Sequence, residues 1–115
     1  MKFLEGVLDG TPYTITIEDG ALVFQCGEDR QTAQGPAMLM DYLKAQDLEL
    51  PTDDMTQLSK LAYEGWIVVQ ALLNVRGSWE KVAAADIDPV LYLADDNIQA
   101  AIRILLLGQI TEDTP

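Results

Sequence analysis

The sequence predicts an α+β domain, in which an N-terminal three-stranded antiparallel meander is followed by three to five helices packed on one face of the sheet. Two observations lead to this prediction. Apolar and polar residues alternate over residues 13–18, with an Asp-Gly pair on each side. From residue 52 onward, apolar residues recur instead at the spacing of a helix. Strands followed by helices are typical of α+β folds.

Three strands are expected between residues 3 and 26. The alternating residues 13–18 include β-branched and aromatic types, which favour strands. Asp-Gly pairs at 9–10 and 19–20 flank this run, and an Asp-Gly pair between two such runs is the strongest short-range signal for a hairpin. Residues 3–8 and 22–26 supply the first and third strands. The polar, turn-rich residues 27–35 are expected to form a loop.

Two helices are expected between residues 36 and 76. Pro36 suits the first position of a helix that continues to Lys44. Thr52 is expected to cap the second helix, with Asp53 and Asp54 in the first turn, at the positive end of the helix dipole. An apolar stripe then follows one face of this helix, formed by Met55, Leu58, Leu61, Ala62, Gly65, Val69, Leu72 and Leu73.

The middle of this second helix is apolar on more than one face. Trp66, Ile67 and Val68 widen the apolar stripe, which predicts burial on several sides. Gly65 in a helix interior costs about 1 kcal/mol relative to Ala, so we expect it to let another element approach closely. Lys60 and Glu64 have the i,i+4 spacing of an ion pair.

Shorter helices are expected after Gly77, which is placed to end the second helix. Ser78 can cap a short helix, and Asp88-Pro89 is a second start signal. One helix could cover residues 89–107, but a break at residues 95–96 is favoured because adjacent carboxylates suit a helix start better than its interior. Gly108 is expected to end the last helix. The prediction is one domain over 1–115, divided into a 1–26 meander, a 36–108 helical part and a frayed 109–115 tail.

The charge is strongly negative and evenly distributed. The chain has 19 acidic and 7 basic residues, giving a formal net charge of −12, and residues 1–50 and 51–115 each carry −6. Such a surface repels nucleic-acid phosphates and anionic lipids and attracts cationic proteins, although solubility alone would also explain it. The single Cys26 excludes an internal disulfide. The N-terminus does not resemble a signal peptide and no apolar run is long enough to span a membrane, so a cytoplasmic location is expected.

The side chains available for catalysis are few. Histidine is absent, which removes the commonest general base and the commonest zinc ligand. Cys26 has acidic neighbours, which do not lower a thiol pKa, and is expected to pack as a small apolar residue. Adjacent carboxylates such as Asp95 and Asp96 could bind Mg²⁺ or Ca²⁺, but they diverge on a helix and suit helix starts. No glycine-rich phosphate loop is present. We therefore expect no enzymatic activity, no cofactor and no metal site.

The sequence accordingly predicts a non-enzymatic interaction module that binds a basic protein surface. The specific form is a small inhibitor or immunity-type protein that occupies a nucleic-acid site on its partner, with carboxylates in place of phosphates. It is expected to bind neither nucleic acid nor membrane directly. The candidate contacts are the acids of turns, loops and helix starts, namely Asp9, Asp19, Glu28, Asp29, Asp53, Asp54, Asp86, Asp88, Asp95 and Asp96.

The alternative is a self-associating accessory subunit, for example of a phage particle or a larger complex. The helices carry more apolar surface than a small sheet and one helix layer can readily bury, so a homodimer is a secondary expectation. Methionine adapts to varied partners and tryptophan is enriched at interface hot spots. The candidate residues for such an apolar interface are Trp66, Ile67, Trp79, Leu106 and Leu107.

Overall fold

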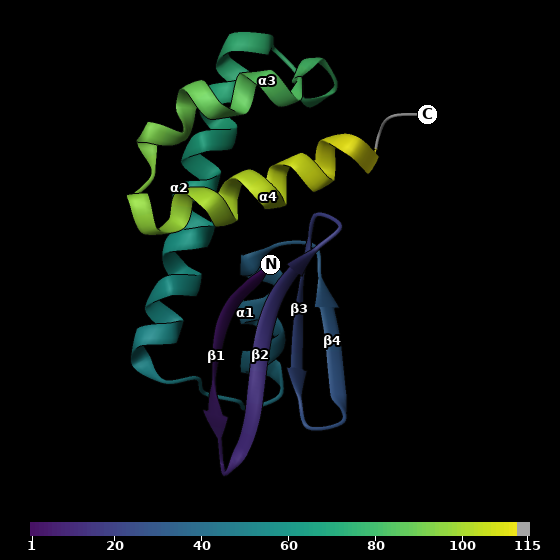
Figure 1. The fold of residues 1–115 in the computed structure, drawn as a ribbon, viewed down its shortest axis with the longest axis vertical. Coiled ribbons are helices and arrows are strands. Elements are labelled where there is room, and N and C mark those ends of the chain that lie inside the picture. The colour runs from purple at the N-terminus through teal and green to yellow at the C-terminus, as the bar shows by residue number, and fades with distance from the viewer. Residues whose placement is uncertain (113–115) are drawn as a thin grey trace.

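A computed structural model describes residues 1–112 of the chain and confirms the α+β class. Figure 1 shows a sheet with helix α1 behind it, helix α4 across one end, and helix α2 alongside. The strands follow one another in the order β1-β2-β3-β4 and all pair antiparallel. The elements are β1 Lys2–Leu8, β2 Thr11–Glu18, β3 Ala21–Cys26, β4 Asp29–Ala33, α1 Pro36–Ala45, α2 Thr52–Arg76, the 3-10 turn η1 Trp79–Lys81, α3 Ala84–Ile87, the 3-10 helix η2 Asp88–Leu93 and α4 Asp96–Glu112.

The first two hairpins form where the Asp-Gly pairs predict them. Asp9 and Gly10 have φ of 48° and 82°, and Asp19 and Gly20 have φ of 52° and 79°. Positive φ at both central residues is the geometry of a type I′ turn, whose twist matches that of the strands it joins. The register follows from these turns, with Ile15 opposite Phe24 and Ile17 opposite Leu22. The predicted three-stranded meander is therefore present.

The prediction of a loop over residues 27–35 is wrong, because β4 forms a fourth strand there. Gly27, with φ of 62°, and Glu28 connect the paired residues Cys26 and Asp29. A two-residue loop with glycine first is a further hairpin signal. The polar composition of β4 suits an edge strand, where charged side chains discourage pairing with other chains. Only Ala33 in this strand is buried, so the strand carries almost no apolar pattern.

The sheet buries one face and leaves the other polar. Directly paired residues share a face, so the buried positions of β2 and β3 lie together, and they are Tyr13, Ile15, Ile17, Leu22 and Phe24. α1 contacts this sheet at β3 and β4, and α4 contacts it at β2 and β3. The opposite face is mostly polar, with Thr14, Thr16, Gln25, Arg30 and Thr32 around the buried Val23. Of the helices, α1 and α4 thus contact the sheet, and α2 packs against these two helices.

Helices α1 and α2 begin and end close to the expected residues. Pro36 is the first residue of α1. Thr52 is the first residue of α2 rather than its cap, and the cap position is occupied by Pro51, without a side-chain hydrogen bond. Asp53 and Asp54 lie in the first turn, and Gly77 ends the helix in the left-handed conformation, with φ of 86°.

The glycines inside α2 and α4, Gly65 and Gly108, do not have the roles predicted for them. A Cβ at Gly65 would meet no atom within 4 Å outside its own helix, so no element approaches it closely. A Cβ at Gly20 would lie 2.8 Å from backbone atoms of Gly108 and Gln109, because α4 crosses the β2–β3 turn there. Gly108 does not end a helix, since α4 continues to Glu112. The close approach predicted for Gly65 is found at Gly108.

The chain between α2 and α4 forms short helical segments, and the predicted break before α4 is confirmed. The turn η1 and helix α3 replace the single short helix expected after Ser78. η2 begins at Asp88-Pro89, and α4 begins at Asp96. The amides of Ile98 and Gln99 donate to the Asp95 carbonyl, which closes the first turn of α4. Of the tail predicted to fray, residues 109–112 belong to α4 and 113–115 lie outside the described residues. No helix within residues 1–112 combines the length and hydrophobicity needed to cross a membrane.

Candidate protein-interaction surfaces

Half of the acids predicted to contact a partner instead bond to groups within the chain. Asp54 accepts a hydrogen bond from the Tyr13 hydroxyl. Asp86 and Asp88 form ion pairs with Arg76 and Arg103. The other two bonded acids are Asp95, which forms an ion pair with Lys60, and Asp96, which accepts a hydrogen bond of 3.3 Å from Gln99.

Tyr13 and Asp54 connect the sheet to the start of α2, although 41 residues separate them. The Tyr13 ring is buried against the β1 backbone, where a Cβ at Gly6 would lie 2.7 Å from the Tyr13 hydroxyl oxygen. Burial, and then the hydrogen bond to Asp54 and its negative charge, raise the Tyr13 pKa well above its ordinary value. The phenol therefore stays protonated and donates to the carboxylate, which gives this contact a structural role.

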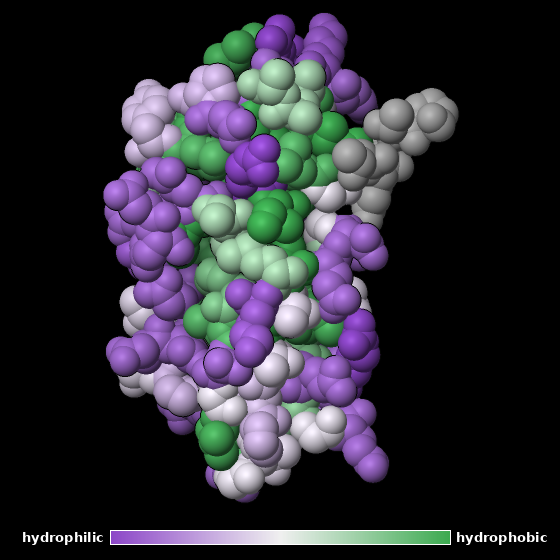
Figure 2. All heavy atoms as spheres, viewed as in Figure 1, coloured by the Kyte–Doolittle hydropathy of each residue, from purple (hydrophilic) through white to green (hydrophobic). Residues whose placement is uncertain are grey.

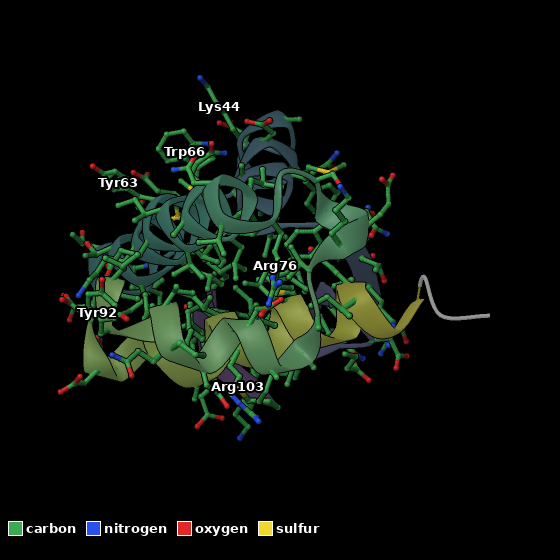
Figure 3. All side chains as sticks on the ribbon, turned by 90° about the horizontal axis from the view of Figure 1, so that it is seen from above. Lys44, Tyr63, Trp66, Arg76, Tyr92 and Arg103 are labelled. Carbon is green, nitrogen blue, oxygen red and sulfur yellow. The ribbon has the colours of Figure 1, made fainter. Side chains whose placement is uncertain are left out.

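Arg76 and Asp86 hold the segment after α2 against that helix. The Arg76 guanidinium contacts both Asp86 carboxylate oxygens, at 3.0 Å and 2.5 Å, and Asp86 also accepts the Ala83 amide at 2.9 Å. Figure 3 shows Arg76 between α2 and the segment that contains α3, whereas Arg103 lies at the outer side of the molecule, where it pairs with Asp88. The hydrogen bonds from Arg76 and then from Ala83 lower the Asp86 pKa below its ordinary value.

Lys60 forms its ion pair with Asp95 at the start of α4, rather than with Glu64 as the helical spacing predicts. The Glu64 carboxylate instead accepts the Asp95 amide at 2.6 Å. Lys60 and Glu64 therefore both fasten the first turn of α4 to α2. The hydrogen bond to Asp95 is the main reason that the Lys60 pKa is raised, with a smaller contribution from the charge of Glu64.

The remaining acids concentrate at one end of the molecule. The β1–β2 and β3–β4 turns lie at the same end of the sheet, and α1 ends and α2 begins there too (Figure 1). Six exposed carboxylates in these segments have no hydrogen-bond or ion-pair partner within residues 1–112. We call this set the acidic end: Asp9, Glu28, Asp29, Asp47, Glu49 and Asp53.

The basic residues do not neutralise the acidic end. Five of the seven form ion pairs elsewhere in residues 1–112, leaving only two lysines without one. Lys44 lies near the end of α1, and Lys81 lies in η1. Asp19 is exposed at the opposite end of the sheet, on the β2–β3 turn. The exposed charge that lacks an internal partner is thus predominantly negative.

The residues predicted for an apolar interface do not form one surface. Trp66 is 61% exposed, Ile67, Trp79 and Leu107 are partly buried, and Leu106 is buried in the core. Figure 2 shows apolar side chains along the middle of one face, over α4 and the adjoining end of the sheet, with hydrophilic residues on both sides. The large exposed apolar residues of α4 and the segment before it are Tyr92, Leu93 and Ile104.

A groove lies between α1, α2 and α4, around the position where Gly65 has no side chain. Its apolar part has a volume of about 230 Å³ and is lined almost entirely by apolar residues, including Met38, Leu61, Gly65, Trp66 and Leu105. Beside it, Tyr63 and Trp66 point outward from α2 (Figure 3), and Met38 is 56% exposed. The spacing of the stripe in α2 predicts burial of this region, and it does not indicate that α1 and α4 leave a hollow.

The groove continues along α1 and α2 toward the acidic end. A shallower hollow adjoins the apolar pocket and shares Ala37, Ala62 and Trp66 with it. That hollow shares Met40 and Asp41 with another, which the α1–α2 loop lines with Asp47 and Glu49. The lining therefore gains acidic side chains toward the α1–α2 loop, although Met40, Leu43 and Leu48 keep part of it apolar. Asp41, Asp47 and Glu49 were not among the predicted contacts, because nothing in the local sequence places them beside a groove.

The described residues contain no cluster suited to binding a metal ion. Within residues 1–112, no three residues of the metal-binding types Cys, Asp and Glu come together as a site. Cys26 ends β3 partly buried against the core, on the same side as Phe24, in line with packing as a small apolar residue. Asp54 and Tyr13 are occupied by each other. The arrangement offers charge and apolar surface for binding.

Comparisons with known proteins identify no relatives. No family model matches the chain, and no curated protein or solved structure resembles it significantly.

Proposed function

We propose that this chain is a non-enzymatic interaction module that binds a basic protein surface. In its specific form, it is an inhibitor or immunity-type protein that occupies the nucleic-acid site of its partner. The observation that carries the proposal is the acidic end, where six exposed carboxylates from separate segments lie at one end of the molecule without partners in residues 1–112. Such an arrangement speeds association with a cationic surface and repels nucleic acid itself.

The rigidity of these segments supports the proposal. Four of the six carboxylates lie in tight hairpin turns, next to such a turn, or in the first turn of α2, where the backbone is fixed: Asp9, Glu28, Asp29 and Asp53. Fixed charges lose less conformational entropy on binding than charges on a flexible tail. The wide distribution of these residues over the sequence means that only the folded chain presents them together.

Capture from a cell lysate tests this function. The chain is immobilised, and bound proteins are identified after washing at about 0.1 M and at about 1 M salt, where the screening length falls from about 10 Å to about 3 Å. We expect basic, nucleic-acid-binding proteins that elute at high salt and compete with added DNA. A control chain with Asp9→Asn, Glu28→Gln and Asp29→Asn should capture less. Salt-insensitive capture, or direct binding of DNA to the chain, would contradict the proposal.

The second candidate is self-association as an accessory subunit. It is favoured by the apolar strip in Figure 2 and by the exposed apolar side chains of α4 and the segment before it, where Ile104 and Leu93 are each 36% exposed and Tyr92 is 76% exposed. Mass measured over a dilution series tests it. A dimer that persists in high salt and is lost on Ile104→Glu would support this candidate, and a monomer at every concentration would exclude it.

A further inference from the structure

We propose that the groove along α1 and α2 is a docking site for a cationic amphipathic helix of the partner protein. The inference rests on the proposed function, since both require a basic partner, and adds the shape of the segment and the place where it binds. Helix-in-groove recognition needs a pocket for an apolar anchor and a surface that matches the flanking charges. Both are present along this groove.

The apolar end suits one bulky side chain of a protein. Its volume of about 230 Å³ is below the roughly 300–1,000 Å³ typical of small-molecule sites. Trp66 and Met38 stand at its edge, 61% and 56% exposed, and both residue types are common at interfaces because they offer large or adaptable contact area. A glycine at position 65 keeps the pocket open.

The charged residues at the other end of the groove determine which charge a bound helix should carry. The hollows beyond the pocket are lined by four acids and two lysines: Asp41, Asp47, Glu49, Glu64, Lys44 and Lys60. Lys60 and Glu64 both already bond to Asp95, which does not line the groove, so three acids and Lys44 remain. A second copy of this chain, with a net charge of −12, would bring like charges together, so a cationic partner is the better match.

The length of the groove indicates how long the bound helix of the partner should be. On α2, the lining residues extend from Met55 to Val69. At 1.5 Å per residue this is about 20 Å, the length of a helix of about 14 residues. The occupant is therefore a helix of four turns, with an apolar anchor near one end and Lys or Arg near the other.

A designed peptide tests the site directly. The probe is a labelled helical peptide of about 14 residues with a leucine face and four lysines in one half, and its control carries glutamates instead of lysines. Binding to the full chain is followed by the anisotropy of the label. We expect saturable binding of the lysine peptide only, with a one-to-one stoichiometry. Failure of the lysine peptide to bind would overturn the inference. The proposed function would not be affected, because capture of basic proteins tests it separately.

Two matched pairs of variants locate the binding. Gly65→Leu fills the pocket, and Val75→Leu places the same side chain at a position on α2 that is 72% exposed and outside the groove. The triple variant Asp41→Asn, Asp47→Asn, Glu49→Gln is compared with Asp9→Asn, Glu28→Gln, Asp29→Asn, which removes the same charge at the hairpin turns. Circular dichroism checks that every variant is folded.

The expected result is specific to the groove. Gly65→Leu and the groove triple should each weaken peptide binding at least tenfold, and the two controls should change it less than threefold. If both triple variants weakened peptide binding equally and Gly65→Leu did not weaken it, the docking site would be overturned. The peptide would then bind the acidic surface in general. A dimer that Gly65→Leu dissociates would show that a second copy occupies the groove, and would also overturn the inference.

Discussion

At the scale of single residues, Tyr13 has the most consequential contact in the fold. Its ring fills the space left by Gly6 on β1, and its hydroxyl donates to Asp54 at the start of α2. A hydrogen bond to a charged acceptor contributes about 1.5–3 kcal/mol, more than a typical neutral one. The contact therefore fixes how α2, and with it one side of the groove, is set against the sheet.

Tyr13→Phe should lower the free energy of unfolding by about 1.5–3 kcal/mol, because Asp54 loses its donor while the ring stays in place. Urea unfolding measures the change. Tyr92→Phe is the control, since that ring is 76% exposed and its hydroxyl has no partner within residues 1–112. Equal stability of the two variants would show that the Tyr13 hydroxyl is not important.

The ion pair between Arg76 and Asp86 predicts a pH dependence. The Asp86 pKa is lower in the folded chain than its ordinary value of 3.8, so its stabilising contribution is complete above about pH 4 and is lost as the pH falls through the folded pKa. Asp86→Asn should therefore destabilise the chain at pH 7 and have a smaller effect at pH 3. Urea unfolding at both pH values, with Asp29→Asn as an exposed control, checks this. If Asp86→Asn lowered the free energy of unfolding by the same amount at both pH values, this prediction would be wrong.

At the scale of elements, the two glycines inside helices predict opposite responses to the same substitution. Gly65→Ala should stabilise α2 by about 1 kcal/mol, since the methyl group enters open space and alanine is the better helix former. Gly108→Ala should destabilise the chain, because its Cβ would lie 2.9 Å from the Asp19 carbonyl carbon and force α4 off the β2–β3 turn. Thermal and urea unfolding of both variants measure the pair. Changes of the same sign would show that α4 does not meet the turn this closely.

The elements also show what could be predicted from the sequence. The Asp-Gly turns and the start of α4 were predicted because local chemistry determines them. β4 was missed because its place depends on the free edge of β3, and its own residues are mostly polar. The close approach predicted for Gly65 occurs at Gly108 instead, since close approach depends on which element lies opposite, and that is a property of the tertiary fold.

At the scale of the whole molecule, the fold sorts the acidic residues into two groups. Those at the starts of α3, η2 and α4 bond to Arg76, Arg103 and Lys60 and hold the helices together. Those at the β1–β2 and β3–β4 turns and the α1–α2 loop are left facing solvent at one end. The sequence predicts the overall charge but not this division, because the partners of Asp86, Asp88 and Asp95 depend on which helices meet.

The central claim is that the exposed carboxylates occupy a site that nucleic acid would otherwise fill on a basic partner. Its most direct test is a titration of this chain into a complex of one captured basic protein and a fluorescein-labelled DNA duplex. We expect the anisotropy of the label to fall to that of free DNA, and to do so at higher chain concentration for the Asp9→Asn, Glu28→Gln, Asp29→Asn variant. An anisotropy that stays constant or rises, because the chain joins the complex or binds the DNA itself, would contradict the claim.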